Sequence, residues 1–463
     1  MASGMRAMVW HQVQCARWRA SHILVAITVV LAVLLAHPLA AQTDGDRSAY
    51  ETAFEAMMAD LGNPEKSFAF VVTAVEVGDI RGAIAALERV LLIRPDLANV
   101  KMELGLLYRA AGAPETAETY LAEAEASGEV PAELQERLEQ EIAAAQAARA
   151  PHRLTGSLFL GGRYETNANA GPDSRSIRTA DGPATLGPED TEQSDVSAIA
   201  ALSLNHRYDL GWQSGDELQT DLVLYGNRYA DETSSNVALI DLTVGPRFNW
   251  IDTDRPFSLR PFVTGALLWL GDAFYREQAG GGLTIEQTLH PRLRADLTVR
   301  GVYQKLNSSS RNRRASDRTG PLYTLDLGVT TELTPSTILR ARGRGQLKDA
   351  DKDFRSFVSF GGGAALTQYF PSPIAALPSP WSASLSADYT RFRYDEPNRP
   401  IDPDSSQRDN RLDLGVSLNM PFAASWEAVA EVTYTDNNSN YDTEDFDNLA
   451  VMLGVTYRFS LLP

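Results

Sequence analysis

From residue 154 to the end of the chain, apolar and polar residues alternate in about fourteen segments separated by turns. The alternation is clearest in Leu-Arg-Ala-Asp-Leu-Thr-Val-Arg at 293–300 and in the stretch 381–389. Because successive side chains of a strand point to opposite faces, each segment has one apolar face and one polar face. A long series of such strands is typical of a transmembrane β-barrel, with lipid outside and polar residues lining the lumen.

The same alternation gives the expected strands and their number. They are 154–164, 194–208, 216–230, 237–250, 257–270, 274–288, 292–306, 319–333, 336–347, 353–369, 381–394, 409–420, 425–436 and 445–460. We expect an antiparallel barrel of about 14 strands, an even number as in single-chain bacterial barrels, with about twelve or sixteen as the alternatives.

The connections between these strands differ in length. The first connection, 165–193, is the longest, and the connections 307–318 and 395–408 are also expected to open outward. The inward turns are mostly tight, as at His290-Pro291 and Thr334-Pro335, although 371–380 is longer. Long loops outside and short turns inside are typical of outer-membrane barrels.

Glycines and aromatic residues add detail to the barrel. The runs 280–282 and 361–363 are all glycine and predict bent, bulged or closely approached backbone. Aromatic residues near strand ends are candidates for the girdles that meet the membrane interfaces; they are Trp250, Trp269, Tyr225, Tyr229 and Tyr457.

Between about residue 48 and residue 150 the period of apolar residues becomes helical. Two segments align at a spacing of about 34, with Gly78 on Gly112, Ala83 on Ala117 and Ala86 on Tyr120. This is the tetratricopeptide pattern, in which helix pairs stack and present a concave binding surface. Helices at 44–59 and 134–148 are expected to flank the two units, and a plain helical bundle is the alternative.

Partner binding by this helical segment has two candidate residues. Tyr108 and Arg109 lie at the end of the first helix of the second repeat. A packing role for Tyr108 is the alternative interpretation.

The first residues predict a secretory signal peptide. Arg6, Arg17 and Arg19 precede an apolar run from 23 to 36, and small residues follow at 40–41. The run is short for a membrane-spanning helix, which needs about 20 residues. We expect cleavage after Ala41, with an uncleaved anchor helix as the alternative. Cys15, the single cysteine, would leave with the signal peptide, so disulfides and thiolate metal sites are not expected.

The chain therefore divides into a signal peptide at 1–41, a periplasmic tetratricopeptide-like domain at 42–150 and an outer-membrane barrel at 151–463. The expected fold class is α+β multidomain, with the helical domain before the barrel. The formal net charge is −18, and −21 without the three arginines of the signal peptide. Such acidity argues against nucleic-acid binding, which needs a basic surface.

One expected strand carries an unusual polar face. Arg340, Arg342, Arg344 and Lys348 alternate with small and apolar residues, so a strand places all four on one side. That side should face the lumen, because arginine facing lipid costs about 2–4 kcal/mol at the midplane of the bilayer. Two interpretations remain: pairing with carboxylates of neighbouring strands, such as Asp326 or Asp296, and an anion-selective lumen.

The residues offer little support for catalysis. After signal cleavage the histidines are His152, His206 and His290, and they do not show metal-ligand spacing. Nucleophile elbows and phosphate-binding glycine loops are not found in a suitable context. We expect no enzyme activity, no cofactor and no bound metal.

The layout and one motif resemble a known family. The opening of the first expected strand reads Gly-Gly-Arg-Tyr-Glu-Thr-Asn-Ala-Asn-Ala at 161–170, and the positions of interest in it are Gly161, Gly162, Tyr164, Asn167 and Asn169. Together with a signal peptide, a short tetratricopeptide domain and a fourteen-stranded barrel, this motif is similar to the surface lipoprotein assembly modulator (Slam) family of Gram-negative bacteria.

The resemblance implies a location and partners. It implies an outer-membrane protein, inserted by the barrel assembly machinery, that helps to translocate lipoproteins or secreted proteins to the cell surface. The helical domain would recruit the client or its chaperone from the periplasm. One departure is that the chain ends Phe459-Ser460-Leu461-Leu462-Pro463 and not on an aromatic residue. Phe459 would then serve as the internal insertion signal.

Two other functions remain open at this point. An exopolysaccharide exporter would also join tetratricopeptide repeats to a barrel, although with a longer repeat array. A passive porin would use its helical domain only as an adaptor for another envelope component.

Overall fold

The computed structural model describes residues 44–60, 63–127, 130, 132–149, 151–212, 214–250, 255–310, 312–374, 377 and 379–462. The expected signal peptide lies outside these residues. The chain forms a helical unit that ends at Gln146 and a β unit that begins at Ala147. Within the described ranges, no helix is both long and apolar enough to cross a membrane.

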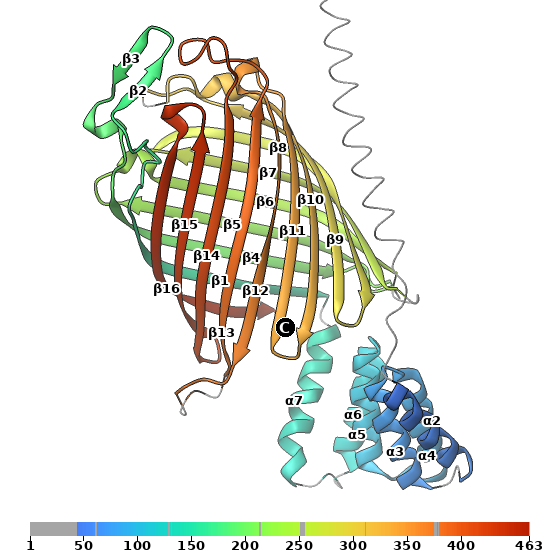
Figure 1. Ribbon diagram of the computed structural model, residues 1–463. Helices are drawn as coiled ribbons and strands as arrows, with labels where there is room; N and C mark the ends of the chain where they lie inside the picture. The colour runs from blue at the N-terminus through green and yellow to red at the C-terminus, as the bar shows by residue number, and fades with distance from the viewer. Residues whose placement is uncertain are drawn as a thin grey trace, which may run out of the picture. The chain divides into compact units, whose positions relative to one another are not determined.

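The helical unit consists, in its described part, of six helices arranged largely in antiparallel pairs (Figure 1). They are α2 (Asp44–Met58), α3 (Pro64–Glu76), α4 (Ile80–Ile93), α5 (Ala98–Ala110), α6 (Pro114–Ser127) and α7 (Ala132–Arg149). The pairs α3/α4 and α5/α6 are the two predicted repeat units, and α2 and α7 are the predicted flanking helices.

The turns inside the two repeat units are the same turn. Gly78 and Gly112 have φ values of +84° and +78°. In both turns the N–H after the glycine donates to the carbonyl five residues earlier, from Asp79 to Ala74 and from Ala113 to Tyr108. This is the Schellman arrangement, in which a left-handed residue ends a helix and glycine adopts that conformation without a steric penalty. The predicted repeat is confirmed at the level of backbone geometry.

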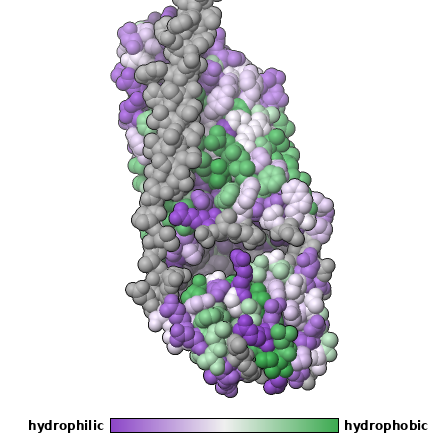
Figure 2. Space-filling model, turned by 90° about the vertical axis from the view of Figure 1, so that its right-hand side faces the viewer, coloured by the Kyte–Doolittle hydropathy of each residue, from purple (hydrophilic) through white to green (hydrophobic). Residues whose placement is uncertain are grey.

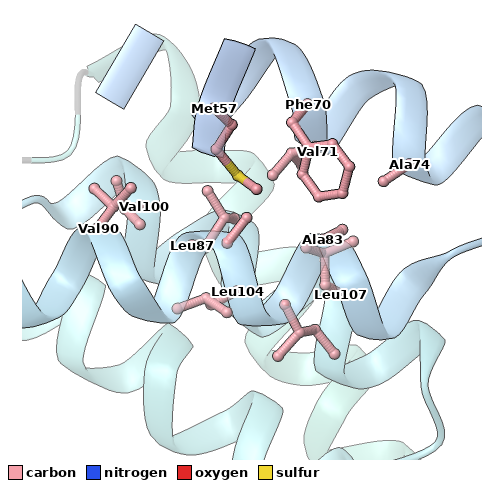
Figure 3. Close-up of a cluster of buried hydrophobic side chains, with 12 residues drawn as sticks. Met57, Phe70, Val71, Ala74, Ala83, Leu87, Val90, Val100, Leu104 and Leu107 are labelled. Atoms are coloured by element: carbon pink, nitrogen blue, oxygen red, sulfur yellow. The ribbon is translucent and has the colours of Figure 1, made fainter. Parts of the chain in front are cut away.

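The core of the helical unit lies between the helix pairs. Figure 3 shows Met57 of α2 and Phe70 of α3 facing Leu87 of α4, with Leu104 and Leu107 of α5 beneath them. Ala83 and Ala117, which align in the repeat, are both fully buried. Their small side chains let the paired helices approach closely, which explains why alanine recurs at this position.

The β unit is a closed barrel of fourteen antiparallel strands, so the predicted fold class is confirmed. The strands are β1 (His152–Glu165), β4 (Asp195–Asp209), β5 (Glu217–Tyr229), β6 (Val237–Trp250), β7 (Phe257–Leu270), β8 (Ala273–His290), β9 (Leu293–Leu306), β10 (Gly320–Thr334), β11 (Thr337–Lys348), β12 (Phe357–Phe370), β13 (Trp381–Tyr394), β14 (Arg408–Ala423), β15 (Trp426–Ser439) and β16 (Phe446–Leu462). Each strand pairs with its neighbour in sequence, and β1 closes the barrel against β16.

Ion pairs between second-neighbour strands identify the inner face of the barrel. Arg260 of β7 reaches Asp221 of β5 at 2.5 Å, across the intervening strand β6. Such strands are about 10 Å apart, and their side chains converge only on the concave side of the sheet. The polar face of each strand is therefore the lumen face.

The opposite face is apolar and exposed. Its exposed side chains include Leu160, Ile240, Val263, Val299, Val329, Leu366, Leu385, Val416, Val432 and Leu453. Figure 2 shows hydrophobic surface over the middle of the barrel wall, with hydrophilic surface above and below it. An apolar outer band around a polar interior is how barrels span a membrane.

The two ends of the barrel differ. One end, which we call the loop end, carries the long connections 166–194, 307–319 and 395–407. The other end, the turn end, carries short connections such as 291–292, 335–336 and 424–425, and the longer 371–380. The first long connection contains a small hairpin, β2 (Ser176–Thr179) and β3 (Gly182–Thr185), which the sequence pattern did not predict.

The glycine runs show one of their predicted features. The runs 280–282 and 361–363 pair in regular register, and the bulges lie near strand ends. Close approach of the backbone is the feature found, since a Cβ on Gly280 would lie 2.1 Å from the carbonyl oxygen of Gly301. Two of the predicted girdle residues, Tyr225 and Tyr229, face the lumen instead, because they share the face of β5 that carries Asp221. Tyr229 is buried there, and its hydroxyl donates to Glu165 and accepts from Arg163.

Candidate functional site

The predicted basic strand is β11, and its guanidinium groups have carboxylate partners. Arg342 forms a two-point pair with Asp388 of β13, with both N–O distances at 2.6 Å. Arg344 pairs with Asp326 of β10 at 2.5 Å. Arg340 donates to the hydroxyl of Thr330 at 3.4 Å. Pairing is thus the arrangement at Arg342 and Arg344, and Asp388 replaces the expected Asp296 as a partner.

A glycine makes room for the first of these pairs. A Cβ on Gly363 of β12 would lie 1.9 Å from Oδ1 of Asp388 and 2.5 Å from the carbonyl oxygen of Ala387. The Asp388 carboxylate thus occupies the space above Gly363 and extends toward Arg342. Gly328 and Asp296 repeat the arrangement, with an ideal Cβ 2.2 Å from the carboxylate.

Lys348, the last residue of the basic strand, has a different environment. It is 4% exposed, and its ammonium group donates to the side-chain oxygen of Gln304 at 3.1 Å and to the carbonyl of Gly320 at 2.8 Å. Both acceptors are uncharged, so the ammonium group of Lys348 donates to neutral oxygen atoms, whereas Arg342 and Arg344 donate to carboxylates.

Lys348 lies in a cavity of about 200 Å³ at the loop end of the lumen. Three more cations line the same cavity: Arg276 of β8, Arg318 at the end of η3 (Ala315–Arg318) and Arg355 at the end of η4 (Asp353–Arg355). Two tyrosines, Tyr275 and Tyr394, complete the polar lining. The sequence pattern does not predict this cluster, because its four cations come from four elements and show no common spacing.

The loops next to the cavity hold a buried acid. Glu444 ends η5 (Asp442–Glu444), and burial raises the pKa of its carboxyl, an effect that Arg355 and Arg318 partly offset. Burial and the nearby Arg318 lower the pKa of the Arg355 guanidinium. The Arg355 guanidinium and the Glu444 carboxyl are therefore partly removed from solvent.

The barrel-start motif fixes the base of the longest loop. The amide of Asn167 donates to the carbonyls of Gly171 at 2.7 Å and of Asp447, on β16, at 2.9 Å. Its oxygen accepts from the N–H of Gly171 at 2.9 Å. Asn169 holds the far side of the loop, donating to Thr191 at 2.7 Å and accepting from Gln193 at 3.0 Å. Where the strand pairing ends, the side chains of both asparagines form the hydrogen bonds with backbone groups that a neighbouring strand forms within the sheet.

The other members of the motif belong to the barrel wall. Gly161 faces the lumen under the ring of Phe159, which would lie 2.7 Å from a Cβ there. Gly162 faces outward with space around it, and Tyr164 is an exposed outer residue near the loop end. Phe459 of β16 lies against Gly156 of β1 in the closing pair of strands.

Tyr108 and Arg109 make contacts inside the helical unit. The hydroxyl of Tyr108 donates to Glu88 of α4, and its ring stacks on Tyr120 of α6 at a centroid distance of 5.5 Å. Burial, together with Glu88, raises the pKa of this phenol. Arg109 pairs with Glu141 of α7 at 2.8 Å. The two side chains link α5 to three other helices.

Exposed apolar side chains lie elsewhere on the helical unit. On α3, Val72 and Val75 are 58% and 43% exposed, and Leu92 at the end of α4 is 85% exposed. Val72 and Val75 are three residues apart, so they share one face of their helix.

Three carboxylates also meet near the base of the first long loop. Ligand atoms of Asp173, Glu192 and Asp447 lie within 4.8 Å of one another. Exposed acids of this kind are common in proteins that bind no metal.

Comparison with known proteins finds solved structures that are similar to parts of the chain. No protein-family model matches the sequence, and no curated protein matches it. Among solved structures, MamA matches at 19% identity with a TM-score of 0.20, over 22% of this chain. The chain covers 55% of the length of that MamA structure.

Two barrel structures match a larger share of the chain. A bacterial polysaccharide outer membrane secretin matches at 12% identity and a TM-score of 0.34, covering 66% of this chain and 98% of its own. OmpT of Vibrio cholerae with loop L8 deleted matches at 7% identity and a TM-score of 0.34, covering 67% of this chain and 100% of its own. At such scores these matches carry no argument about function.

Proposed function

We propose that this chain is an outer-membrane protein that assists the translocation or surface display of lipoproteins or secreted proteins. Its helical unit would stand in the periplasm and recruit the client or its chaperone. The observation that carries the proposal is the union, in one chain, of tetratricopeptide-like helix pairs with a closed fourteen-stranded barrel.

The order of the elements supports a periplasmic helical unit. The chain enters the barrel at His152, the first residue of β1, which lies at the turn end. In outer-membrane barrels the short turns face the periplasm and the long loops face outward. A domain that precedes β1 is then on the side from which exported clients arrive.

The surface of the helical unit supports recruitment of a protein. Stacked helix pairs of this type present extended surfaces that bind other chains. Val72, Val75 and Leu92 are exposed apolar side chains of the helical unit. A non-polar segment of a client or chaperone is the chemistry that fits them.

Photo-cross-linking in intact envelopes tests the proposal. A photoreactive amino acid replaces Val72 in the full-length chain, and a matched control places it at Glu136, an exposed residue of α7. We expect the Val72 variant alone to capture an exported protein that disappears from the cell surface when the gene is deleted. Capture at both positions, or unchanged surface proteins after deletion, would contradict the proposal.

A second candidate function rests on a different observation. Four cations line the cavity at the loop end of the lumen, as expected for a porin or an exporter of anionic polysaccharide. Planar-bilayer recording of the purified protein separates the candidates. Large steady currents in the absence of any client would favour the porin, whereas a closed barrel is expected of a client-gated translocator.

A further inference from the structure

We infer that the cavity lined by Arg276, Arg318, Lys348 and Arg355 is a binding site for a compact oxyanion of the phosphate or sulfate class. We call it the basic cavity. It lies inside the barrel at the loop end, has a volume of about 200 Å³ and also contains the side chains of Tyr275 and Tyr394.

The basic cavity differs from the parts of the lumen where guanidinium groups have carboxylate partners. Such ion pairs are Arg342–Asp388, Arg260–Asp221 and Arg247–Glu286, all at 2.5–2.6 Å. Among the residues that the structure describes, none of the four cations of the basic cavity forms an ion pair. Arg318 reaches the hydroxyl of Tyr275 at 3.4 Å, and Lys348 reaches only Gln304 and Gly320.

Two of the arginines have donors without acceptors. Nε of Arg276 and Nε of Arg355 are buried and have no hydrogen-bond partner. A buried donor without a partner is costly, and more so when it carries charge. Two such donors in one cavity, next to a lysine that is 4% exposed, indicate that the partner comes from outside the chain.

The lining of the basic cavity contains four cations and no carboxylate. Glu444 of η5 is the buried acid near Arg318 and Arg355, and Asp317, Asp349 and Asp351 lie in the neighbouring loops. None of them is within ion-pair distance of the four cations in the described structure. A doubly charged anion inside the cavity would pair with the cations of the lining, which the nearby acids do not reach.

The volume of the basic cavity and the hydrogen-bond donors in its lining determine the class of ligand that fits. The cavity has room for a tetrahedral oxyanion with a few waters and is too small for a folded segment of another protein. Guanidinium forks match the oxygen geometry of phosphate, and tyrosine hydroxyls add neutral donors. Because the donors come from β8, β11, η3, η4 and β13, a bound anion would also tie two loops to the barrel wall.

Equilibrium titration of the full-length protein in detergent, with inorganic phosphate at low chloride, tests the inference. We expect sub-millimolar affinity and a loss on the order of tenfold in each of Arg276→Gln and Arg355→Gln, since each substitution removes a charged hydrogen-bond donor. Arg411→Gln is the matched control, because Arg411 pairs with Asp413 on its own strand at 3.0 Å. Its phosphate affinity should stay within about twofold of wild type. Glucose 6-phosphate as a competitor tells whether an esterified phosphate also enters.

Unfolding temperatures distinguish a loss of phosphate binding from a folding defect of the variants. Without phosphate, Arg355→Gln should be at least as stable as wild type, because the substitution removes a partly buried charge that forms no ion pair in the described structure. With phosphate, wild type and Arg411→Gln should gain more stability than Arg276→Gln and Arg355→Gln at the same concentration, as ligand linkage requires. Absence of phosphate and sulfate binding up to about 10 mM, or equal losses in Arg411→Gln, would overturn the inference. The measurement needs no client, so its outcome is separate from that of the proposed translocation.

Discussion

Gly363 shows how single residues arrange charge inside this barrel. The space that its missing side chain leaves is occupied by the carboxylate of Asp388, which pairs in turn with Arg342. An ion pair inside a water-lined lumen needs such shape complementarity, because solvent competes with a loosely placed partner.

Gly363→Ala should therefore disturb the pair. The new methyl group would meet the carboxylate and, at 2.5 Å, the backbone oxygen of Ala387, which cannot move aside without shifting β13. We expect a loss of about 1–3 kcal/mol in the free energy of unfolding, typical of overpacking. Urea titration followed by tryptophan fluorescence measures it. Gly345→Ala is the control, since a Cβ there would meet nothing within 4 Å, and equal losses in both variants would refute the explanation.

At the same scale the sequence predicted positions but not partners. Period-two alternation placed Arg340, Arg342, Arg344 and Lys348 on one face, and the strand geometry follows that pattern. It did not identify Asp388, because a partner 46 residues away depends on the order of strands. Arg276, Arg318 and Arg355 were missed for a stronger reason: the loops η3 and η4 bring them together, and loop conformation leaves no periodic pattern.

At the scale of elements, the turn of the helical repeat was predictable because its left-handed backbone conformation favours glycine. Gly112→Ala should destabilise the helical unit by about 1–2 kcal/mol, since an L-residue pays that much in the left-handed conformation. Far-ultraviolet circular dichroism during urea unfolding of the full-length protein would follow the helices. Gly112→Asn should lose less, because asparagine tolerates this conformation, and an equal loss would mean that the turn is not the cause.

The longest loop depends on Asn167 in the same way. Asn167→Ala removes three hydrogen bonds that join the loop base to itself and to β16. We expect faster tryptic cleavage at Arg175 and Arg178 in folded protein, because the loop opens more often. Ser174→Ala, which changes only a contact near the loop tip, is the control and should be cleaved at the wild-type rate.

The hairpin of this loop carries a pH-dependent contact. The guanidinium of Arg178 in β2 holds the pKa of the Asp442 carboxyl below its usual range. A lowered folded-state pKa means that the contact stabilises the loop above the ordinary aspartate pKa of about 3.9 and is lost as pH falls through the lowered value. Hydrogen exchange of the 176–179 segment, corrected for intrinsic rates, should rise in that acidic range. Arg178→Gln should exchange fast at neutral pH already.

At the scale of the whole molecule, fourteen strands could be counted from the sequence because alternation is imposed by two different solvents. Lipid outside and water inside act on every strand, so the pattern repeats along 300 residues and its strand boundaries agree to within a few residues. The hairpin β2/β3 was not predicted, because it lies in a loop outside the barrel wall, where lipid and lumen water do not impose alternation. The ion pairs and the basic cavity inside the lumen were not predicted, because a polar strand face indicates contact with water but not the partner of each side chain.

Loss of the last strand should have a larger effect than loss of a loop. Deleting 446–463 would leave β1 and β15 with unpaired edges, and open edges cannot persist in lipid. We expect aggregation and no folded barrel by gel mobility before heating. Deleting the β2/β3 hairpin, 175–186, should leave a folded barrel, and a folded product of the first deletion would disprove the role of the closing pair.

The pairing of β1 with β16 has a consequence for the time course of biogenesis. Thr166 and Asn448, which meet beside this pair, are 282 residues apart, so the contact forms only after the entire barrel has been synthesised. Every other strand pair joins sequence neighbours and is available early. Contacts of such long range form slowly, because the chain entropy must be lost before they contribute. Closure is then the last and slowest event, and until it occurs the open sheet has two unpaired edges, one at β1 and one at its newest strand.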